Sequence, residues 1–112
     1  MLLRTSLLAL LIATPAWAED APAGSADNGK ALFVAQGCYE CHGYVGQGGA
    51  AGPTLAPPKW NFLRFSAVLR NPPNEMPPYT TRVLSDQQLA DVFAFLGSLP
   101  PPPKLETLPL LR

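Results

Sequence analysis

Two cysteines and the only histidine of the chain stand together in the run Cys38-Tyr39-Glu40-Cys41-His42. A C-x-x-C-H run is typical of sites where a c-type haem is attached covalently. Two thiols three positions apart on one helical turn can each add to a vinyl group of the same porphyrin. The histidine that follows can then present a ring nitrogen to the iron. We therefore expect one haem, attached through Cys38 and Cys41 and ligated by His42.

Three other kinds of site use a similar cysteine spacing. A thioredoxin-like redox pair expects a neighbouring βαβ pattern, which the sequence does not show. A structural zinc site needs four ligands, whereas the chain offers only two cysteines and one histidine. A disulfide between Cys38 and Cys41 stays open as an alternative, although it would close a very short loop and give His42 no role.

Met76 is the only methionine besides the first residue of the chain. It lies 34 residues after His42, next to Pro77 and Pro78, and a residue that precedes a proline favours extended backbone. A lone methionine is usually core filler, but a rigid loop is also a good way to hold a weak thioether ligand. Because histidine and methionine together ligate haem iron in electron transfer, we predict that Met76 is the second iron ligand.

Two further residues are candidates for the haem site. Pro53 follows a glycine-rich stretch, residues 43–52, which is either a flexible surface loop or a loop that wraps closely around a flat ligand. The Pro53 carbonyl can accept a hydrogen bond from the His42 ring, and such a bond orients a metal-bound histidine. Trp60 has an indole N–H that needs a partner when buried. A haem propionate and ordinary packing at a helix start are equal alternatives for it.

Helices must position these residues, and the first is predicted between Ser25 and Gly37. Ser25 is a good N-cap residue, Asp27 adds negative charge to the first turn, and Gly37 is a stop signal. Gly29 inside this helix costs about 1 kcal/mol relative to alanine. We expect that another element approaches closely at Gly29, on the face that Phe33 shares.

Two more helices are predicted in the second half of the chain. Phe62, Phe65 and Leu69 recur on one face between about Asn61 and Arg70. The last helix begins with a capping box of Ser85 and Gln88 and ends before Pro100. Its apolar stripe consists of Leu89, Val92, Phe93 and Leu96. We expect Gly29 to contact this helix around Val92 to Leu96.

The first 18 residues resemble a secretory signal peptide. Arg4 supplies the positive charge, Leu7 to Ala13 form a short apolar run, and Ala16-Trp17-Ala18 fits a cleavage site. The apolar run is too short to span a bilayer, so an uncleaved anchor is the weaker alternative. We expect cleavage after Ala18, export to the periplasm and no membrane span in the mature chain.

Removal of 18 of the 112 residues leaves 94, which suits one small domain. We divide it into a flexible leader (residues 19–24), a haem domain (25–100) and a proline-rich C-terminal tail (101–112). Without Arg4 the chain keeps seven basic and eight acidic side chains. This balance lacks the basic patch of a nucleic-acid-binding protein.

Taken together, the motifs resemble those of bacterial class I cytochromes c across nearly the whole mature chain. The resemblance is carried by segments 29–33, 38–43, 52–55, 76–79 and 84–100. It implies an all-α cytochrome c fold, with three to four helices wrapped around one covalent haem. It also implies that the first and last helices cross near Gly29 and Phe33, and that the Pro53 carbonyl orients His42.

The function that follows is periplasmic electron transfer by a haem that cycles between Fe(III) and Fe(II), without substrate chemistry of its own. The chain would be a free carrier or a subunit of a dehydrogenase. Its partners would be redox proteins such as a periplasmic dehydrogenase and a terminal oxidase or another cytochrome. The alternative is a haem enzyme or ligand sensor, which needs an open sixth iron position. The proline-framed Met76 favours electron transfer.

Overall fold

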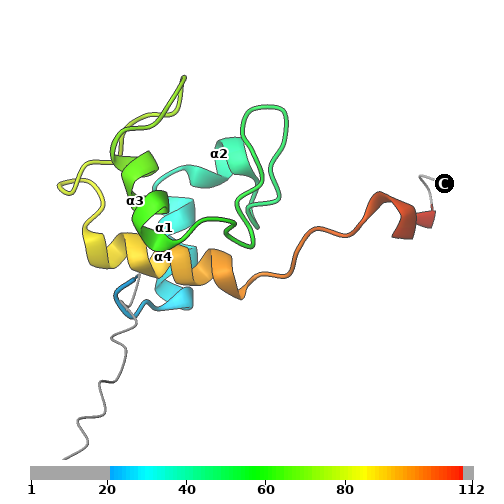
Figure 1. The fold of residues 1–112 in the computed structure, drawn as a ribbon, viewed down its shortest axis with the longest axis horizontal. Helices are drawn as coiled ribbons and strands as arrows, with labels where there is room; N and C mark the ends of the chain where they lie inside the picture. Colours follow the sequence, from blue (N-terminus) through cyan, green and yellow to red (C-terminus); the bar gives the residue numbers. More distant parts are fainter. Residues whose placement is uncertain (1–20, 110–112) are drawn as a thin grey trace, which may run out of the picture.

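The computed structural model describes residues 21–109, and these residues form helices and loops without a β-strand (Figure 1). The all-α class predicted from the sequence is confirmed. The expected signal peptide and residues 110–112 lie outside the described residues. The helices are α1 (Ala26–Ala35), α2 (Cys38–His42), α3 (Phe62–Arg70), α4 (Asp86–Ser98) and the 3-10 turn η1 (Leu105–Thr107).

Short-range capping bonds set where the three longer helices begin. The Ser25 hydroxyl accepts a hydrogen bond from the Asn28 N–H at 3.2 Å, as the sequence predicts. The Asn61 side chain caps α3 in the same way. The predicted capping box of α4 is present, because the Ser85 hydroxyl and the Gln88 side chain each accept from the other's backbone N–H. Each cap satisfies backbone N–H groups that have no partner within the helix.

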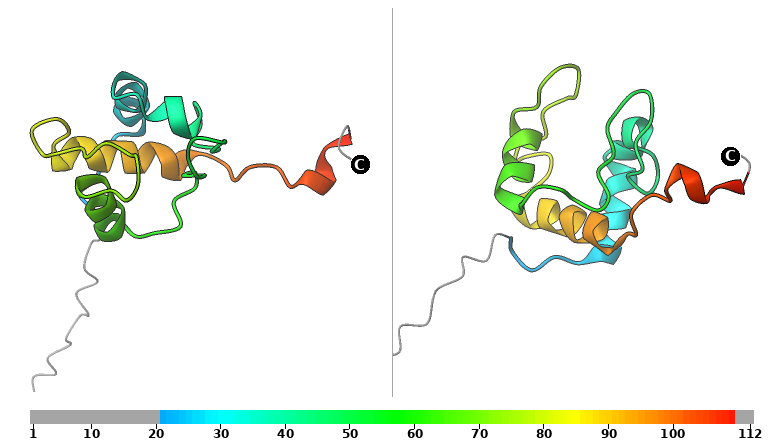
Figure 2. Two further views of the ribbon diagram at one scale, coloured as in Figure 1. Left: turned by 90° about the horizontal axis from the view of Figure 1, so that it is seen from above. Right: turned by 45° about the vertical axis from the view of Figure 1, so that its right-hand side comes forward.

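Helix α4 is the central element, with α1 on one side and α3 on the other (Figure 2). The ring of Phe33 on α1 packs against that of Phe95, with ring centroids 5.5 Å apart. On the other side, Phe62 and Phe65 of α3 both pack against Phe93, at 5.5 and 5.2 Å. Tilted and edge-to-face rings at these distances are favourable aromatic contacts.

This arrangement corrects the predicted apolar stripe of α4. Leu89, Val92 and Leu96 are buried as expected, but Phe93 is only half-buried and Phe95, outside the predicted stripe, is 5% exposed. A single stripe describes a helix that packs against one surface. Since α1 and α3 contact α4 from two sides, its buried face is wider than the stripe.

The predicted contact between Gly29 and the last helix is present. A Cβ atom at Gly29 would lie 1.9 Å from the Asp91 carbonyl oxygen and 2.9 Å from the Phe95 Cβ. The contact is therefore centred one residue earlier on α4 than the predicted range. Only glycine allows two helix backbones to approach this closely, which explains a residue that otherwise weakens a helix.

The segments outside the helical core differ in their contacts. Residues 21–24, expected as part of a flexible leader, lie against α4: the Gln87 side chain donates to the Ala23 carbonyl at 2.7 Å. A Cβ at Gly24 would meet the Ala90 carbonyl oxygen. At the other end, residues 100–103 lie near Val45 and Ala56 around a small cavity of about 190 Å³. Beyond them the chain extends away from the helices (Figures 1 and 2).

Candidate functional site

The C-x-x-C-H run forms the short helix α2, which begins directly after Gly37. Gly37 has a left-handed backbone with φ of 74°, which turns the chain sharply between α1 and α2. Cys41 is exposed and Cys38 is half-buried, and both are free thiols. The disulfide alternative is therefore not formed in this structure. Both thiols and the histidine are presented by a single helical turn.

His42 is the buried member of α2, with 8% of its surface exposed. Its Nδ1 lies 2.8 Å from the Pro53 carbonyl oxygen. Because a carbonyl can only accept, Nδ1 must carry a proton and donate, and in the neutral imidazole this leaves the Nε2 lone pair available to a metal. This is the tautomer that a metal-binding histidine needs, with its ring orientation held by the hydrogen bond.

The glycine-rich loop between α2 and Pro53 packs tightly against His42. A Cβ at Gly52 would lie 2.9 Å from the His42 ring and 2.8 Å from the Cys41 carbonyl oxygen. The loop is tied to α2 as well, because the Gly48 N–H donates to the His42 carbonyl at 2.8 Å. This stretch is therefore packed against α2 and the His42 ring and is not a free surface loop.

Met76 lies in the loop between α3 and α4, and in the right view of Figure 2 this loop and the glycine-rich loop both project upward from α4. Met76 is half-buried and packs against the apolar core. Three residues later, Tyr79 anchors the loop: its N–H donates to the Leu69 carbonyl and its hydroxyl donates to the Gln36 carbonyl, both at 2.9 Å. The methionine is thus close to a fixed point of the loop.

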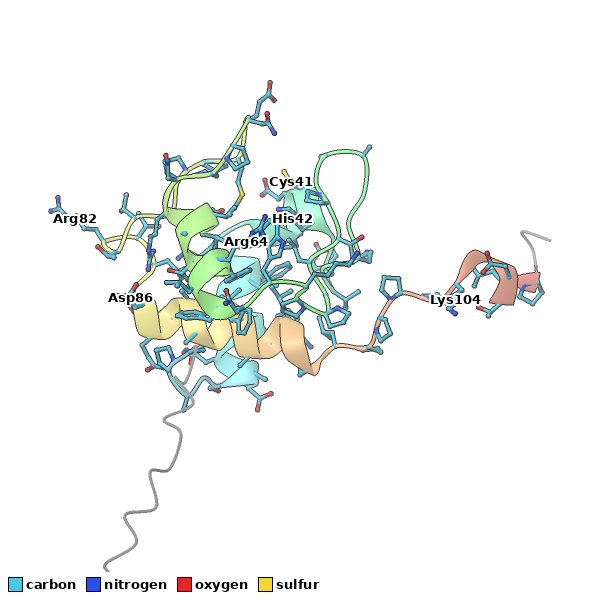
Figure 3. All side chains as sticks on the ribbon, in the orientation of Figure 1. Cys41, His42, Arg64, Arg82, Asp86 and Lys104 are labelled. Atoms are coloured by element: carbon cyan, nitrogen blue, oxygen red, sulfur yellow. The ribbon has the colours of Figure 1, made fainter. Side chains whose placement is uncertain are left out.

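A cavity of about 1470 Å³ lies among these elements. This volume exceeds the usual range of about 300–1,000 Å³ for small-molecule pockets. Figure 3 shows Cys41 and His42 on α2, between the two loops. Every residue predicted for the site contributes to the cavity wall, together with core side chains from α1, α3 and α4: Phe33, Cys38, Cys41, His42, Pro53, Trp60, Phe65, Leu69, Met76, Val92 and Leu96.

Trp60 is at the edge of this cavity, and 43% of its surface is exposed. The Arg64 guanidinium lies over the indole ring, 4.7 Å from its centroid, which is a cation–π contact. Since the side chain is partly in solvent, its N–H does not depend on a partner within the protein. Trp60 therefore lies at the boundary between the cavity and the solvent.

Two ionisable groups in the cavity wall are poorly solvated. Burial raises the pKa of the Cys38 thiol, and weaker hydrogen bonds from its backbone and from Tyr79 oppose that effect. Burial also raises the pKa of the Tyr79 hydroxyl, and the interaction with the neighbouring Cys38 side chain raises it further. Both groups are therefore neutral at pH 7, and the Cys38 side of the cavity is an apolar environment.

Sequence reasoning missed the contacts that Arg70, Tyr79 and Asp91 make. Arg70 and Tyr79 fix the Met76 loop, and Asp91 joins α4 to the start of α1. Arg70 ends a predicted helix and Tyr79 follows two prolines, so the sequence draws attention to both positions. Their hydrogen-bond partners could not be predicted, however, because they are distant in the sequence. Only Asp91 had a usable signal, since it is a charged residue between apolar positions of the α4 stripe.

The family model described as cytochrome C oxidase, cbb3-type, subunit III, matches residues 24–96. The chain belongs to this family of c-type cytochromes. The c-type cytochrome is 32% identical over 99 residues to cytochrome c-555 of Methylococcus capsulatus (strain ATCC 33009 / NCIMB 11132 / Bath). The matched region covers 84% of this chain and 80% of that relative. No solved structure matches the chain.

The cofactor of this c-type cytochrome is haem c, and Cys38 and Cys41 fit its C-x-x-C-H motif. The residues present suit this group, since the cavity is large, mainly apolar and bordered by both thiols and by His42. Among residues 21–109, no cluster of three or more His, Cys, Asp or Glu side chains is placed to hold a separate metal ion. Within the same range, no helix has the length and apolar character of a membrane span.

Proposed function

We propose that this c-type cytochrome is a periplasmic electron carrier or electron-transfer subunit, with haem attached at Cys38 and Cys41 and ligated by His42 and Met76. The observation that carries the proposal is the shared cavity, to which α2 contributes His42 and the α3–α4 loop contributes Met76. Haem iron supplies a one-electron Fe(III)/Fe(II) couple when it is bound. Ligation by histidine and methionine is characteristic of that use.

Each residue of the cavity wall has a definable part in this function. The Pro53 carbonyl holds the His42 ring in one orientation and one tautomer. The soft thioether of Met76 and the apolar wall both favour Fe(II), which raises the reduction potential. With His42 and Met76 both holding the iron, no position would remain open to a substrate. This argues for a carrier rather than an enzyme.

The location and partners follow from the signal-peptide pattern of residues 1–18 and from the redox chemistry. Cysteine thiols meet the haem outside the cytoplasm, so export and covalent attachment belong together. A periplasmic dehydrogenase would be the electron donor, and a terminal oxidase or another cytochrome the acceptor. Such redox contacts are small and short-lived, and the exposed side of Cys41 is the accessible part of the site.

Replacement of Met76 tests the proposal. Met76→Ala should keep the haem attached but remove the sulfur-to-iron charge-transfer band from the red end of the ferric spectrum. The variant should also bind cyanide and carbon monoxide, which the wild type should resist. Val83→Ala is a matched control, because it shortens an exposed apolar side chain of the same loop.

Two results would contradict the proposed function. An unchanged ferric spectrum in Met76→Ala would show that another group ligates the iron. Rapid binding of carbon monoxide by the reduced wild type would show an open iron position, which is what the alternative of a haem enzyme or ligand sensor requires.

A further inference from the structure

The guanidinium of Arg70 joins three separate segments at the end of α3. Its Nη1 donates to the carbonyls of Tyr79 and Leu84, both at 2.7 Å. Its Nη2 forms an ion pair with Asp86 at 2.6 Å, in the first turn of α4. The Arg70 side chain is 21% exposed, whereas that of Asp86 is 70% exposed. The two carbonyl bonds are therefore the better shielded contacts of this arginine.

These contacts close the neck of the loop that contains Met76. The loop covers residues 71–84, and Arg70 stands at its start while Leu84 and Asp86 stand at its end. Arginine suits this role because its planar guanidinium presents several donors in fixed directions. A lysine ammonium has no such fork, so it cannot reproduce the three contacts together.

Tyr79 is fixed from three directions at the same neck. Its carbonyl accepts from Arg70, its N–H donates to the Leu69 carbonyl, and its hydroxyl donates to the Gln36 carbonyl at the end of α1. Both backbone polar groups and the side chain are therefore engaged. Tyr79 cannot move without breaking contacts to α1 and α3 together.

Only Pro77 and Pro78 separate Tyr79 from Met76. Each proline ring locks φ, and consecutive prolines favour an extended chain of about 3.1 Å per residue. Because this spacer is stiff, fixing Tyr79 at one end also restricts the position of Met76 at the other end. The location of the Met76 thioether in the cavity wall thus depends on the bonds made at Tyr79.

We propose that Arg70 is a positioning residue for Met76, which it holds at the cavity by closing the neck of the loop at Tyr79 and Leu84. This inference rests on the proposed ligation of iron by Met76. Loss of the two carbonyl bonds would let the loop swing open more often. The methionine would then leave the iron more readily, although every residue of the cavity wall is still present.

The rate of cyanide binding to the ferric holo-protein measures how often the methionine leaves. Hydrogen bonds from a charged donor contribute enough that Arg70→Gln should bind cyanide at least about tenfold faster than wild type. Arg70→Lys keeps the charge without the fork and should fall between the two. Asp86→Asn should change the rate little, because both carbonyl bonds persist.

Arg82→Gln is the matched control. Arg82 is an exposed arginine of the same loop, and its side chain points away from the helices (Figure 3). Its loss changes the net charge as Arg70→Gln does but leaves the neck of the loop intact. A wild-type cyanide rate is expected for this control, and an equal acceleration in both variants would overturn the proposal.

The outcomes separate this inference from the proposed function. If Met76→Ala accelerates cyanide binding while Arg70→Gln keeps the wild-type rate but melts at a lower temperature, Arg70 is merely structural and the inference is wrong. If Met76→Ala itself has no effect, the ligation proposal fails instead. Should Arg70→Gln yield no holo-protein, Arg70→Lys decides, because a wild-type cyanide rate in that variant would overturn the inference.

Discussion

The backbone of Gly29 on α1 lies directly against the backbone of Asp91 on α4. A methyl group at Gly29 would sit 1.9 Å from the Asp91 carbonyl oxygen, a distance that no Cβ atom tolerates. The helices would have to separate to admit it. Since the same crossing holds the Phe33–Phe95 pair, a separation would loosen the packing on this side of the core.

Gly29→Ala should therefore destabilise the holo-protein by at least about 1–3 kcal/mol, which is typical of overpacking. Denaturant unfolding gives the free energy directly. Gly97→Ala is the matched control, since Gly97 is also inside a helix but has nothing within 4 Å of an added Cβ. It should gain up to about 1 kcal/mol from helix propensity. Equal effects of the two substitutions would argue against the crossing.

Asp91 also joins the two helices through its side chain. Its carboxylate accepts from the Ser25 N–H at 2.8 Å and from the Asn28 amide at 2.6 Å, and the side chain is almost fully buried. The hydrogen bond from Ser25 is the largest cause that lowers the pKa of Asp91; those from Asn28 and Gln87 add to it, and desolvation opposes them.

This shift predicts how stability depends on pH. The folded protein holds the Asp91 pKa below its unfolded value of about 3.9, so the unfolded state binds the proton more readily. The contribution of the carboxylate is complete above the unfolded pKa and is lost as pH falls through the folded pKa. Unfolding of Asp91→Asn should be easier than that of wild type near neutral pH, and the difference should shrink in acid.

A pH series of denaturant unfolding curves checks this expectation, with Asp27→Asn as control. Asp27 is an exposed acid in the first turn of α1 and has no part in the contacts at Asp91. Its replacement leaves the hydrogen bonds of Asp91 in place, so Asp27→Asn should still lose the Asp91 contribution as pH falls. A gap between wild type and Asp91→Asn that stays constant down to about pH 2, below the usual range of aspartate, would refute the assignment.

Gly52 offers a test of how closely the loop must approach His42. Gly52→Ala places a methyl group 2.9 Å from the imidazole, so the ring or the loop must move. We expect a destabilisation of about 1–3 kcal/mol and a shifted reduction potential, because the hydrogen bond to Pro53 would be disturbed. Gly49→Ala, in the same loop with nothing within 4 Å, should behave like wild type. Identical potentials in all three proteins would count against the close approach.

Covalent attachment at α2 predicts a definite mass. The denatured, reduced protein should retain one haem, and its mass should correspond to a chain that begins at Glu19 plus one haem. Acid–acetone should extract no haem from it. Release of the haem by this treatment would rule out thioether bonds at Cys38 and Cys41, and a different start of the chain would correct the cleavage after Ala18.

The sequence predicts best what depends on neighbouring residues. The caps at Ser25 and Ser85, the end of α1 before Gly37 and the start of α3 after Asn61 are all present in the structure. Each depends on a residue that bonds to a backbone group within a few positions. Because the capping residue and its backbone partner are only a few positions apart, few other partners compete, and the residue type alone predicts where the helix begins or ends.

Features that join distant segments were predicted only where one residue type has few uses. Gly29 indicated a close approach because glycine is costly inside a helix. In contrast, the partners of Arg70 are 9 to 16 positions away, and Ser25 and Asn28, which Asp91 joins to α4, are 66 and 63 positions away. A charged side chain has many candidate partners over such separations. The burial of Phe95 was missed for a related reason, since it depends on where α1 crosses α4.

The bond between Ser25 and Asp91 has a consequence for how the chain is made. Along the sequence, the thiols of α2, the glycine-rich loop and the Met76 loop all lie between Ser25 and Asp91. A polypeptide that emerges from its N-terminus presents Cys38, Cys41 and His42 long before α4 exists to close over them. During that interval α1 has no helix to cross, and the thiols belong to a chain that α4 has not yet closed. The domain is complete only when α4 has formed and packs against α1.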